Sequence, residues 1–213
     1  MRILSITAQK PNSTGSGVYL TELVKEYAGM GHDQAVIAGI YKEDDVELPE
    51  GVRFYPVYFE DEKLPFPIAG MSDEMPYRST RYCDMTPEMT ALFKEAFLTA
   101  VDQAVREFDP ELILCHHLYL LTAIVRERYP KRCVYGFCHN TDLRQMMKTE
   151  LEREFIKEQI PKLDRIFVPQ SAQRDGVRKI FGADPEKIEM AGMGYNDKVF
   201  FPAGEKADDG VTR

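Results

Sequence analysis

Several features that mark other protein classes are missing from this 213-residue sequence. No apolar run is long enough to span a membrane, and the chain does not open like a secretory signal peptide. Its 35 acidic residues outnumber its 27 basic ones and give a net charge of −8, so we expect no nucleic-acid partner. A Gly-x-Ser-x-Gly elbow and a Walker loop are also missing, which argues against two common types of α/β enzyme.

Cysteine is scarce, and its spacing is not that of a metal site. There is no Cys-x-x-Cys and no His-Glu-x-x-His, so we expect no bound metal. Because no secretion signal is evident, we expect a cytoplasmic protein with reduced thiols, and nothing in the sequence requires peripheral attachment to a membrane. Three of the four cysteines fall in expected core strands, where a thiol packs as a small apolar group: Cys83, Cys115, Cys133 and Cys138.

The first forty residues carry the clearest pattern in the chain. An apolar run at 3–6 leads into Pro11 and Asn12, then into Gly15-Ser16-Gly17 and an amphipathic run, and a second apolar run spans 35–38. This order predicts a βαβ unit. The glycine loop would leave backbone N–H groups exposed at a helix N-terminus, where a phosphate is favoured, although a tight turn without a ligand is the alternative.

Strand and helix patterns alternate through the rest of the chain. We expect an α/β fold: a Rossmann-like, doubly wound parallel sheet of about seven strands with helices on both faces. Ligands of such sheets bind beyond the carboxyl ends of the strands. The further expected strands are 52–57, 112–115, 133–138, 165–168 and 188–191, and the expected helices are 87–108, 119–129, 142–159 and 171–182.

Residues 59–85 lose this periodicity and are long for a loop in a compact domain. Tyr77, Arg78, Arg81 and Tyr82 bring aromatic and cationic side chains to the segment. Aromatic faces stack on sugars and arginines bind anionic groups, so the segment is a candidate for binding a sugar or an anionic group. An ordinary insertion packed on the domain is an equal alternative.

Histidines follow two of the expected strands. His139 ends the strand at 133–138, where its imidazole could accept a proton or orient a sugar hydroxyl, or could simply cap the next helix. His116 and His117 end the strand at 112–115. Because neighbouring side chains in an extended strand point to opposite faces, we do not expect both to bind one ion. His32 lies at the opposite edge of the sheet and is expected to be structural.

Taken together, these segments resemble the amino-terminal half of a family 4 glycosyltransferase, which has the GT-B architecture of two facing Rossmann-like domains. The resemblance covers residues 1 to about 202. It depends on the order and spacing of several weak motifs: the opening strand with Gly15-Ser16-Gly17, the turn at 31–32, the runs 134–142 and 164–171, and the junction at 191–196 and 200–202.

The resemblance implies transfer of a sugar from a nucleotide-sugar donor to a sugar, lipid or small-molecule acceptor, with retention of anomeric configuration and without a cofactor. Residues 1–202 would form the acceptor-binding domain, and 203–213 would be an interdomain linker or truncated tail. The glycine loop would help bind the donor diphosphate, and His139 would lie at the reaction centre. The expected pocket residues are His117, Asn140, Asp142 and Arg144, and the segment 59–85 with Tyr77, Arg78 and Arg81 would set acceptor specificity.

Two departures from the family pattern limit what this chain could do by itself. The loop has Gly-Ser-Gly where a Gly-Gly pair is common, and the paired glutamates and basic residues of the second domain have no counterpart here. We therefore expect the chain to be inactive without a carboxyl-terminal domain. Two other interpretations stay open: half of a nucleotide-sugar epimerase, and a carbohydrate- or nucleotide-binding module without catalysis.

Overall fold

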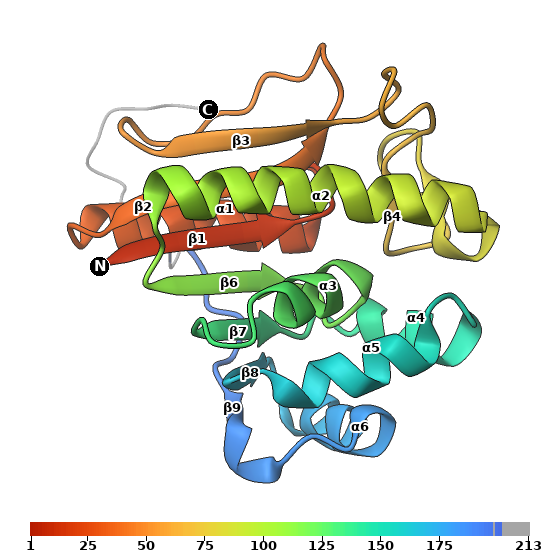
Figure 1. Ribbon diagram of the computed structural model, residues 1–213. Coiled ribbons are helices and arrows are strands. Elements are labelled where there is room, and N and C mark those ends of the chain that lie inside the picture. The colour runs from red at the N-terminus through yellow and green to blue at the C-terminus, as the bar shows by residue number, and fades with distance from the viewer. Residues whose placement is uncertain (198, 202–213) are drawn as a thin grey trace.

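A seven-stranded, entirely parallel sheet forms the centre of the protein (Figure 1). The computed structural model describes residues 1–197 and 199–201. The strand order is β3-β2-β1-β6-β7-β8-β9, and β4 and β5 form a separate short pair. The strands are β1 (Arg2–Thr7), β2 (Asp33–Ile40), β3 (Arg53–Tyr58), β4 (Ala69–Gly70), β5 (Thr80–Arg81), β6 (Leu112–His116), β7 (Val134–Phe137), β8 (Arg165–Val168) and β9 (Ile188–Met190).

Helices cover both faces of the sheet. Helix α1 packs on one face against β1 and β2, whereas α2, α3 and α5 lie on the other face and α6 packs beside α5 (Figure 1). The predicted α/β, Rossmann-like class is confirmed. The helices are α1 (Gly15–Gly29), α2 (Pro87–Phe108), α3 (Leu120–Arg128), α4 (Thr141–Lys148), α5 (Arg153–Gln159) and α6 (Ser171–Phe181), with short 3₁₀ turns at 82–84, 160–162 and 185–187.

The direction in which successive strands are added to the sheet reverses between β1 and β6. From β1 the chain moves outward through β2 to β3, then returns along α2 to place β6 on the other side of β1. This is the topological switch point of a doubly wound sheet, where the loops that leave adjacent strands diverge and open a crevice. The segments that follow β1 and β6 therefore flank the expected ligand site.

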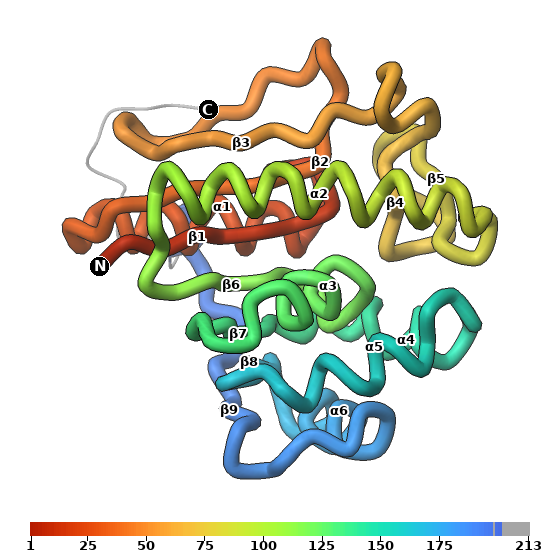
Figure 2. Tube along the Cα trace, viewed as in Figure 1, coloured from red at the N-terminus to blue at the C-terminus, as the bar shows by residue number. Residues whose placement is uncertain are grey.

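The predicted helix over 142–159 is wrong. The chain forms α4 and α5 instead, and the break between them is marked by an extended Thr149 and by Glu152 in the left-handed region (Figure 2). Helix α4 packs against α6, while α5 packs against α3. One straight helix could not present its apolar side to both neighbours, so tertiary packing overrides a sequence that contains no proline or glycine here.

The irregular segment 59–85 is folded into the domain. Phe59, Leu64, Ile68 and Tyr82 are buried in the main hydrophobic cluster, together with Phe93 of α2. In Figure 2 the segment lies at the carboxyl-end side of the sheet, around the start of α2. The predicted tail at 203–213 falls outside the described residues.

Candidate active site

The first turn of α1 lies directly after β1 at the switch point. Thr14 is the N-cap, and its hydroxyl accepts a hydrogen bond from the backbone N–H of Gly17 at 3.1 Å. Gly15, Ser16 and Gly17, predicted as a loop, are thus the first helical residues. A Cβ on Gly17 would lie 2.6 Å from the carbonyl oxygen of Lys10, so glycine permits a close approach of the preceding segment.

His117 connects this helix to the end of β6. Its Nε2 lies 3.0 Å from Oγ of Ser16, and its Nδ1 lies 3.4 Å from Oγ1 of Thr141. The backbone of His117 has a φ of 71° and is therefore left-handed rather than extended. The expectation that His116 and His117 point to opposite faces is consequently wrong: the turn at His117 brings both rings to His139.

The three imidazoles form one cluster. Nδ1 of His116 lies 3.1 Å from Nε2 of His139, and the centroids of the His117 and His139 rings are 4.7 Å apart. The His116 ring also stacks on Phe137 at 4.9 Å, and Tyr19 of α1 presents its ring 5.5 Å from His139.

Burial keeps this cluster uncharged. Desolvation lowers the pKa of His139 to about 4, and it also lowers the pKa values of His116 and His117 well below the usual value. Mutual repulsion among the three rings adds to the effect for His116 and His117. The imidazoles are therefore neutral near pH 7 and can donate or accept hydrogen bonds without carrying charge.

Asp142 stabilises the backbone next to the histidine cluster. Its carboxylate is completely buried and accepts hydrogen bonds from the backbone N–H groups of Leu118 at 2.9 Å and His139 at 3.2 Å. Burial raises the pKa of Asp142, and these donors oppose that shift. Asn140 precedes α4 with a φ of 69°, and its Oδ1 accepts from Gln173 at 3.2 Å. Both predicted pocket residues thus hold the strand-to-helix turn that carries His139.

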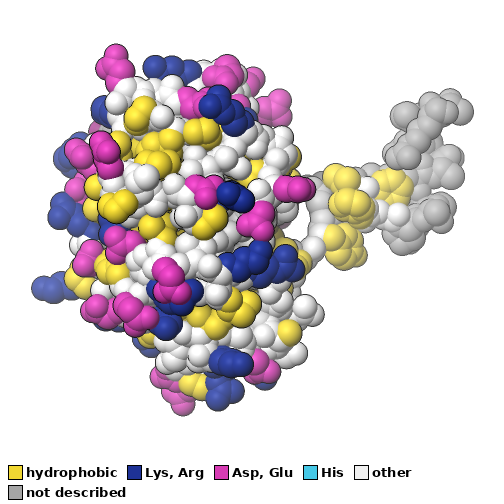
Figure 3. Space-filling view, turned by 90° about the vertical axis from the view of Figure 1, so that its right-hand side faces the viewer, with side chains coloured by type: hydrophobic (Ala, Val, Ile, Leu, Met, Phe, Trp, Pro, Cys, Tyr) yellow, Lys and Arg dark blue, Asp and Glu magenta, His cyan; other side chains and the backbone are white. Residues whose placement is uncertain are grey.

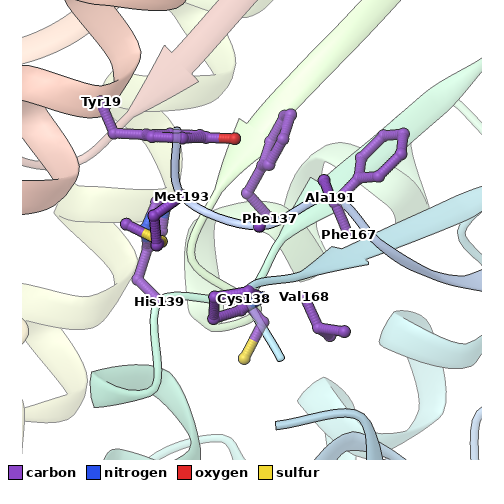
Figure 4. Close-up of a pocket in the computed structure, with 10 residues that line it drawn as sticks. Tyr19, Phe137, Cys138, His139, Phe167, Val168, Ala191 and Met193 are labelled. Atoms are coloured by element: carbon purple, nitrogen blue, oxygen red, sulfur yellow. The ribbon is translucent and has the colours of Figure 1, made fainter. Parts of the chain in front are cut away.

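A small hollow lies at the carboxyl ends of β7, β8 and β9, next to His139. Figure 4 shows Tyr19, Met193 and His139 gathered on one side of it and Phe137 with Phe167 beyond them. Its walls come from three of the strand ends at which the sequence predicted a ligand. The lining residues are Tyr19, Phe137, Cys138, His139, Phe167, Val168, Pro169, Ala191, Gly192 and Met193.

Four predicted site residues lie apart from the histidines. Arg78 and Arg81 are exposed and form ion pairs with nearby carboxylates, Arg78 with Glu60 and Arg81 with Asp84. Arg144 is exposed on α4. Tyr77 faces Lys10, whose Nζ is 5.4 Å from its ring, and burial raises the pKa of its hydroxyl.

Sequence reasoning did not include His116 or Tyr19 in the site. The adjacent histidines after a buried strand were a usable signal, but their convergence depends on the backbone turn at His117. Tyr19 is hidden in the helix pattern, although it lies two residues after Gly17. Within residues 1–197 and 199–201, no three His, Cys, Asp or Glu side chains are placed to hold a metal ion.

The surface around the site mixes both signs of charge. Seen toward the carboxyl ends of the strands, acidic and basic side chains alternate over the body (Figure 3). Among the described helices, none has the length and apolar character needed to cross a membrane.

The parallel sheet with its switch point defines a Rossmann-like α/β domain of the GT-B type. Residues 13–198 match the family described as Glycosyltransferase Family 4. Because the match covers most of the chain, this protein belongs to that family, and it corresponds to an amino-terminal domain of such enzymes. No curated protein sequence matches it significantly.

Solved structures share the fold at low sequence identity. Sucrose-phosphate synthase from Thermosynechococcus elongatus is 13% identical with a TM-score of 0.68, over 95% of this chain and 50% of that one. The lipopolysaccharide outer core galactosyltransferase WaaB is 9% identical (TM-score 0.56; 90% and 45%). UDP-GlcNAc 2-epimerase from Methanocaldococcus jannaschii is 10% identical (TM-score 0.56; 91% and 46%). The chain thus spans about half the length of these three proteins.

Proposed function

We propose that this chain is the acceptor-side half of a retaining glycosyltransferase that moves a sugar from a nucleotide-sugar donor to an acceptor. The family match carries the proposal, and the polar cluster at the switch point gives it a place in the fold. The nucleotide sugar is a substrate in this scheme, and no cofactor is required.

The start of α1 is the proposed contact for the donor diphosphate. Within the described residues, the backbone N–H groups of Gly15 and Ser16 have no acceptor, whereas that of Gly17 is capped by Thr14. The helix dipole adds a partial positive charge at this position. A diphosphate oxygen that accepts from these groups would be stabilised as negative charge builds on the leaving group.

His139 is the proposed contact for the transferred sugar. Its ring is neutral because burial lowers its pKa to about 4, so it would orient a sugar or phosphate oxygen by a hydrogen bond. The segment 59–85, with Tyr77, Arg78 and Arg81, is the proposed region for acceptor specificity. A sugar could stack on an aromatic face there, and an arginine could bind an anionic group.

A second Rossmann-like domain is proposed to complete the cleft and to bind most of the nucleotide. Residues 1–202 would form the first domain and 203–213 the connection. This chain spans about half the length of the sucrose-phosphate synthase and galactosyltransferase structures that share its fold, which supports this division. Without that domain the chain would bind the donor weakly and would not turn it over.

The test compares this chain alone with the same chain joined to a carboxyl-terminal domain from its own gene. Each is incubated with nucleotide sugars and candidate acceptors, and release of nucleoside diphosphate is measured with the anomeric configuration of the product. We expect turnover and retention in the longer protein alone. Turnover by the 213-residue chain would contradict the two-domain requirement, inversion would contradict retention, and epimerised nucleotide sugar would favour the epimerase alternative.

His139→Ala in the longer protein tests the site assignment. A positioned group at the reaction centre contributes about 10²-fold or more to turnover, so the variant should lose that much activity. His32→Ala is the matched control, because His32 contacts Tyr27 at the opposite edge of the sheet. A loss of only a few-fold in His139→Ala would remove His139 from the reaction centre.

A further inference from the structure

The contact between His116 and His139 is an edge-to-edge hydrogen bond between two imidazoles. Their ring planes differ by 16° and their centroids are 5.4 Å apart. Nδ1 of His116 and Nε2 of His139 are 3.1 Å apart. Two imidazoles at this centroid distance can bring their nitrogens about this close only when each nitrogen points straight at the other ring, so both nitrogens lie near the line between the ring centres. One proton must therefore lie between Nδ1 of His116 and Nε2 of His139.

The surroundings of Nε2 of His116 indicate which of the two rings is covalently bonded to that proton. Nε2 of His116 is buried and, among the described residues, has no hydrogen-bond partner. Each ring is neutral and carries one proton. If His139 supplied the shared proton, His116 would carry its own on Nε2, as a buried N–H donor without an acceptor. Orphaned buried N–H donors are the rarest unsatisfied groups in native proteins, whereas a bare nitrogen is better tolerated.

We infer that His116 is a positioning residue that donates its Nδ1 proton to Nε2 of His139 and so fixes His139 with its own proton on Nδ1. His139 lines the hollow beside Tyr19 and Met193, and its Nδ1 has no partner in the described part of the chain. His139 therefore presents an N–H donor to a ligand oxygen, and it does not act as a base through that nitrogen. Stacking on Phe137 at 4.9 Å keeps the His116 ring in this orientation.

This assignment separates two roles that the sequence left open for His139. A base would need a bare nitrogen toward the substrate, whereas a donor orients a hydroxyl or phosphate oxygen. The identity of that oxygen, as part of a nucleotide sugar, rests on the proposed function. The position of the proton rests on the contacts within this chain alone.

The test is a long-range proton–nitrogen correlation spectrum of the histidine side chains in the 213-residue chain near neutral pH. We expect the Nδ1–H tautomer for both His116 and His139. His32 provides a reference in the same spectrum, because it lies apart from the cluster. An Nε2–H tautomer at His139 would overturn the inference, and this measurement needs no variant.

Two substitutions then test whether His116 donates this hydrogen bond to His139. In His116→Asn the side-chain amide can place an N–H close to the position of Nδ1, so His139 should keep its proton on Nδ1. His116→Phe keeps an aromatic ring on Phe137 but removes the donor, so the nitrogen shift of Nε2 of His139 should move to that of an imidazole nitrogen that accepts no hydrogen bond. An unchanged Nε2 shift of His139 in His116→Phe would contradict the positioning role. Failure of sugar transfer with the tautomers as assigned would refute the proposed function alone.

Discussion

Oγ of Ser16 lies 3.0 Å from Nε2 of His117, and this contact joins the first turn of α1 to the end of β6. The two residues follow adjacent parallel strands on either side of the switch point. Ser16 also donates to Oε1 of Gln9 at 3.2 Å, so its hydroxyl connects three segments of the candidate site. The proposed diphosphate contact and the histidine cluster are therefore one polar network.

Ser16→Ala should weaken this connection. Removal of the hydroxyl leaves His117 without that partner, and we expect the free energy of unfolding to fall by about 1 kcal/mol. Ser13→Ala is the control, since the hydroxyl of Ser13 donates to the carbonyl of Pro11 at 3.3 Å and does not contact His117. Urea unfolding measures both variants. Equal losses in the two would mean that the Ser16–His117 contact contributes nothing specific.

Gly17→Ala and Gly15→Ala should have opposite effects. A Cβ on Gly17 meets the Lys10 carbonyl oxygen at 2.6 Å, so crowding should lower the free energy of unfolding by about 1–3 kcal/mol. A Cβ on Gly15 meets no atom of residues 1–197 and 199–201 within 4 Å. Alanine there restricts the unfolded chain and should raise stability by up to about 1 kcal/mol. Thermal unfolding of the two variants provides the comparison, and destabilisation by Gly15→Ala would contradict the packing described here.

Local sequence signals accounted for most of the fold. The helix expected over 87–108 matches α2, and its N-cap is Thr86, whose hydroxyl accepts from the backbone N–H of Met89. Apolar runs bounded by turns located all seven strands of the main sheet, and the central strands β1, β2 and β6 are almost completely buried. The break between α4 and α5 was missed since it arises from contacts with α3 and α6, which no local pattern encodes.

The candidate site was only partly predictable for a similar reason. Strand ends marked His117 and His139, because topology alone brings such positions to one edge. The inclusion of His116 depends on the left-handed turn at His117, and such a turn is uncommon for a residue other than glycine. Arg78 and Arg81 were chosen for their chemistry, and their ion pairs with Glu60 and Asp84 could not be read from composition.

The free energy of unfolding should decrease as the pH is lowered from about 6.5 to about 4, because of the histidine cluster. Burial lowers the pKa of His139 to about 4 and lowers that of His116 and His117 well below the usual value. Below pH ~6.5 the unfolded chain binds protons that the folded chain does not, so the stabilisation present above that pH is lost as the pH falls.

The free energy of unfolding is measured by urea titration at several pH values across this range. Its slope against pH gives the difference in the number of protons bound by the unfolded and folded chains. His139→Gln should reduce that slope by about one proton. A slope that does not change in His139→Gln would mean that His139 is not held neutral in the folded protein.

Asp142→Asn should destabilise the backbone that carries His139. The carboxylate accepts from the backbone N–H groups of Leu118 and His139 through one oxygen and from that of Leu143 through the other, at 3.1 Å. An amide offers one oxygen and one NH₂ group, so at least one of these buried donors would lose its acceptor. We expect a loss of about 1–3 kcal/mol in the free energy of unfolding.

Asp73→Asn is the matched control, because Asp73 is exposed and pairs with Lys148 on the surface, where an ion pair contributes about 1 kcal/mol or less. Hydrogen exchange of the Leu118 and His139 amides separates a local effect from a general one. Both amides should be protected in the natural protein and should exchange faster in Asp142→Asn than the loss of global stability explains. Because the His139 amide lies beside its own imidazole, that local loosening would also disturb the His116–His139 hydrogen bond.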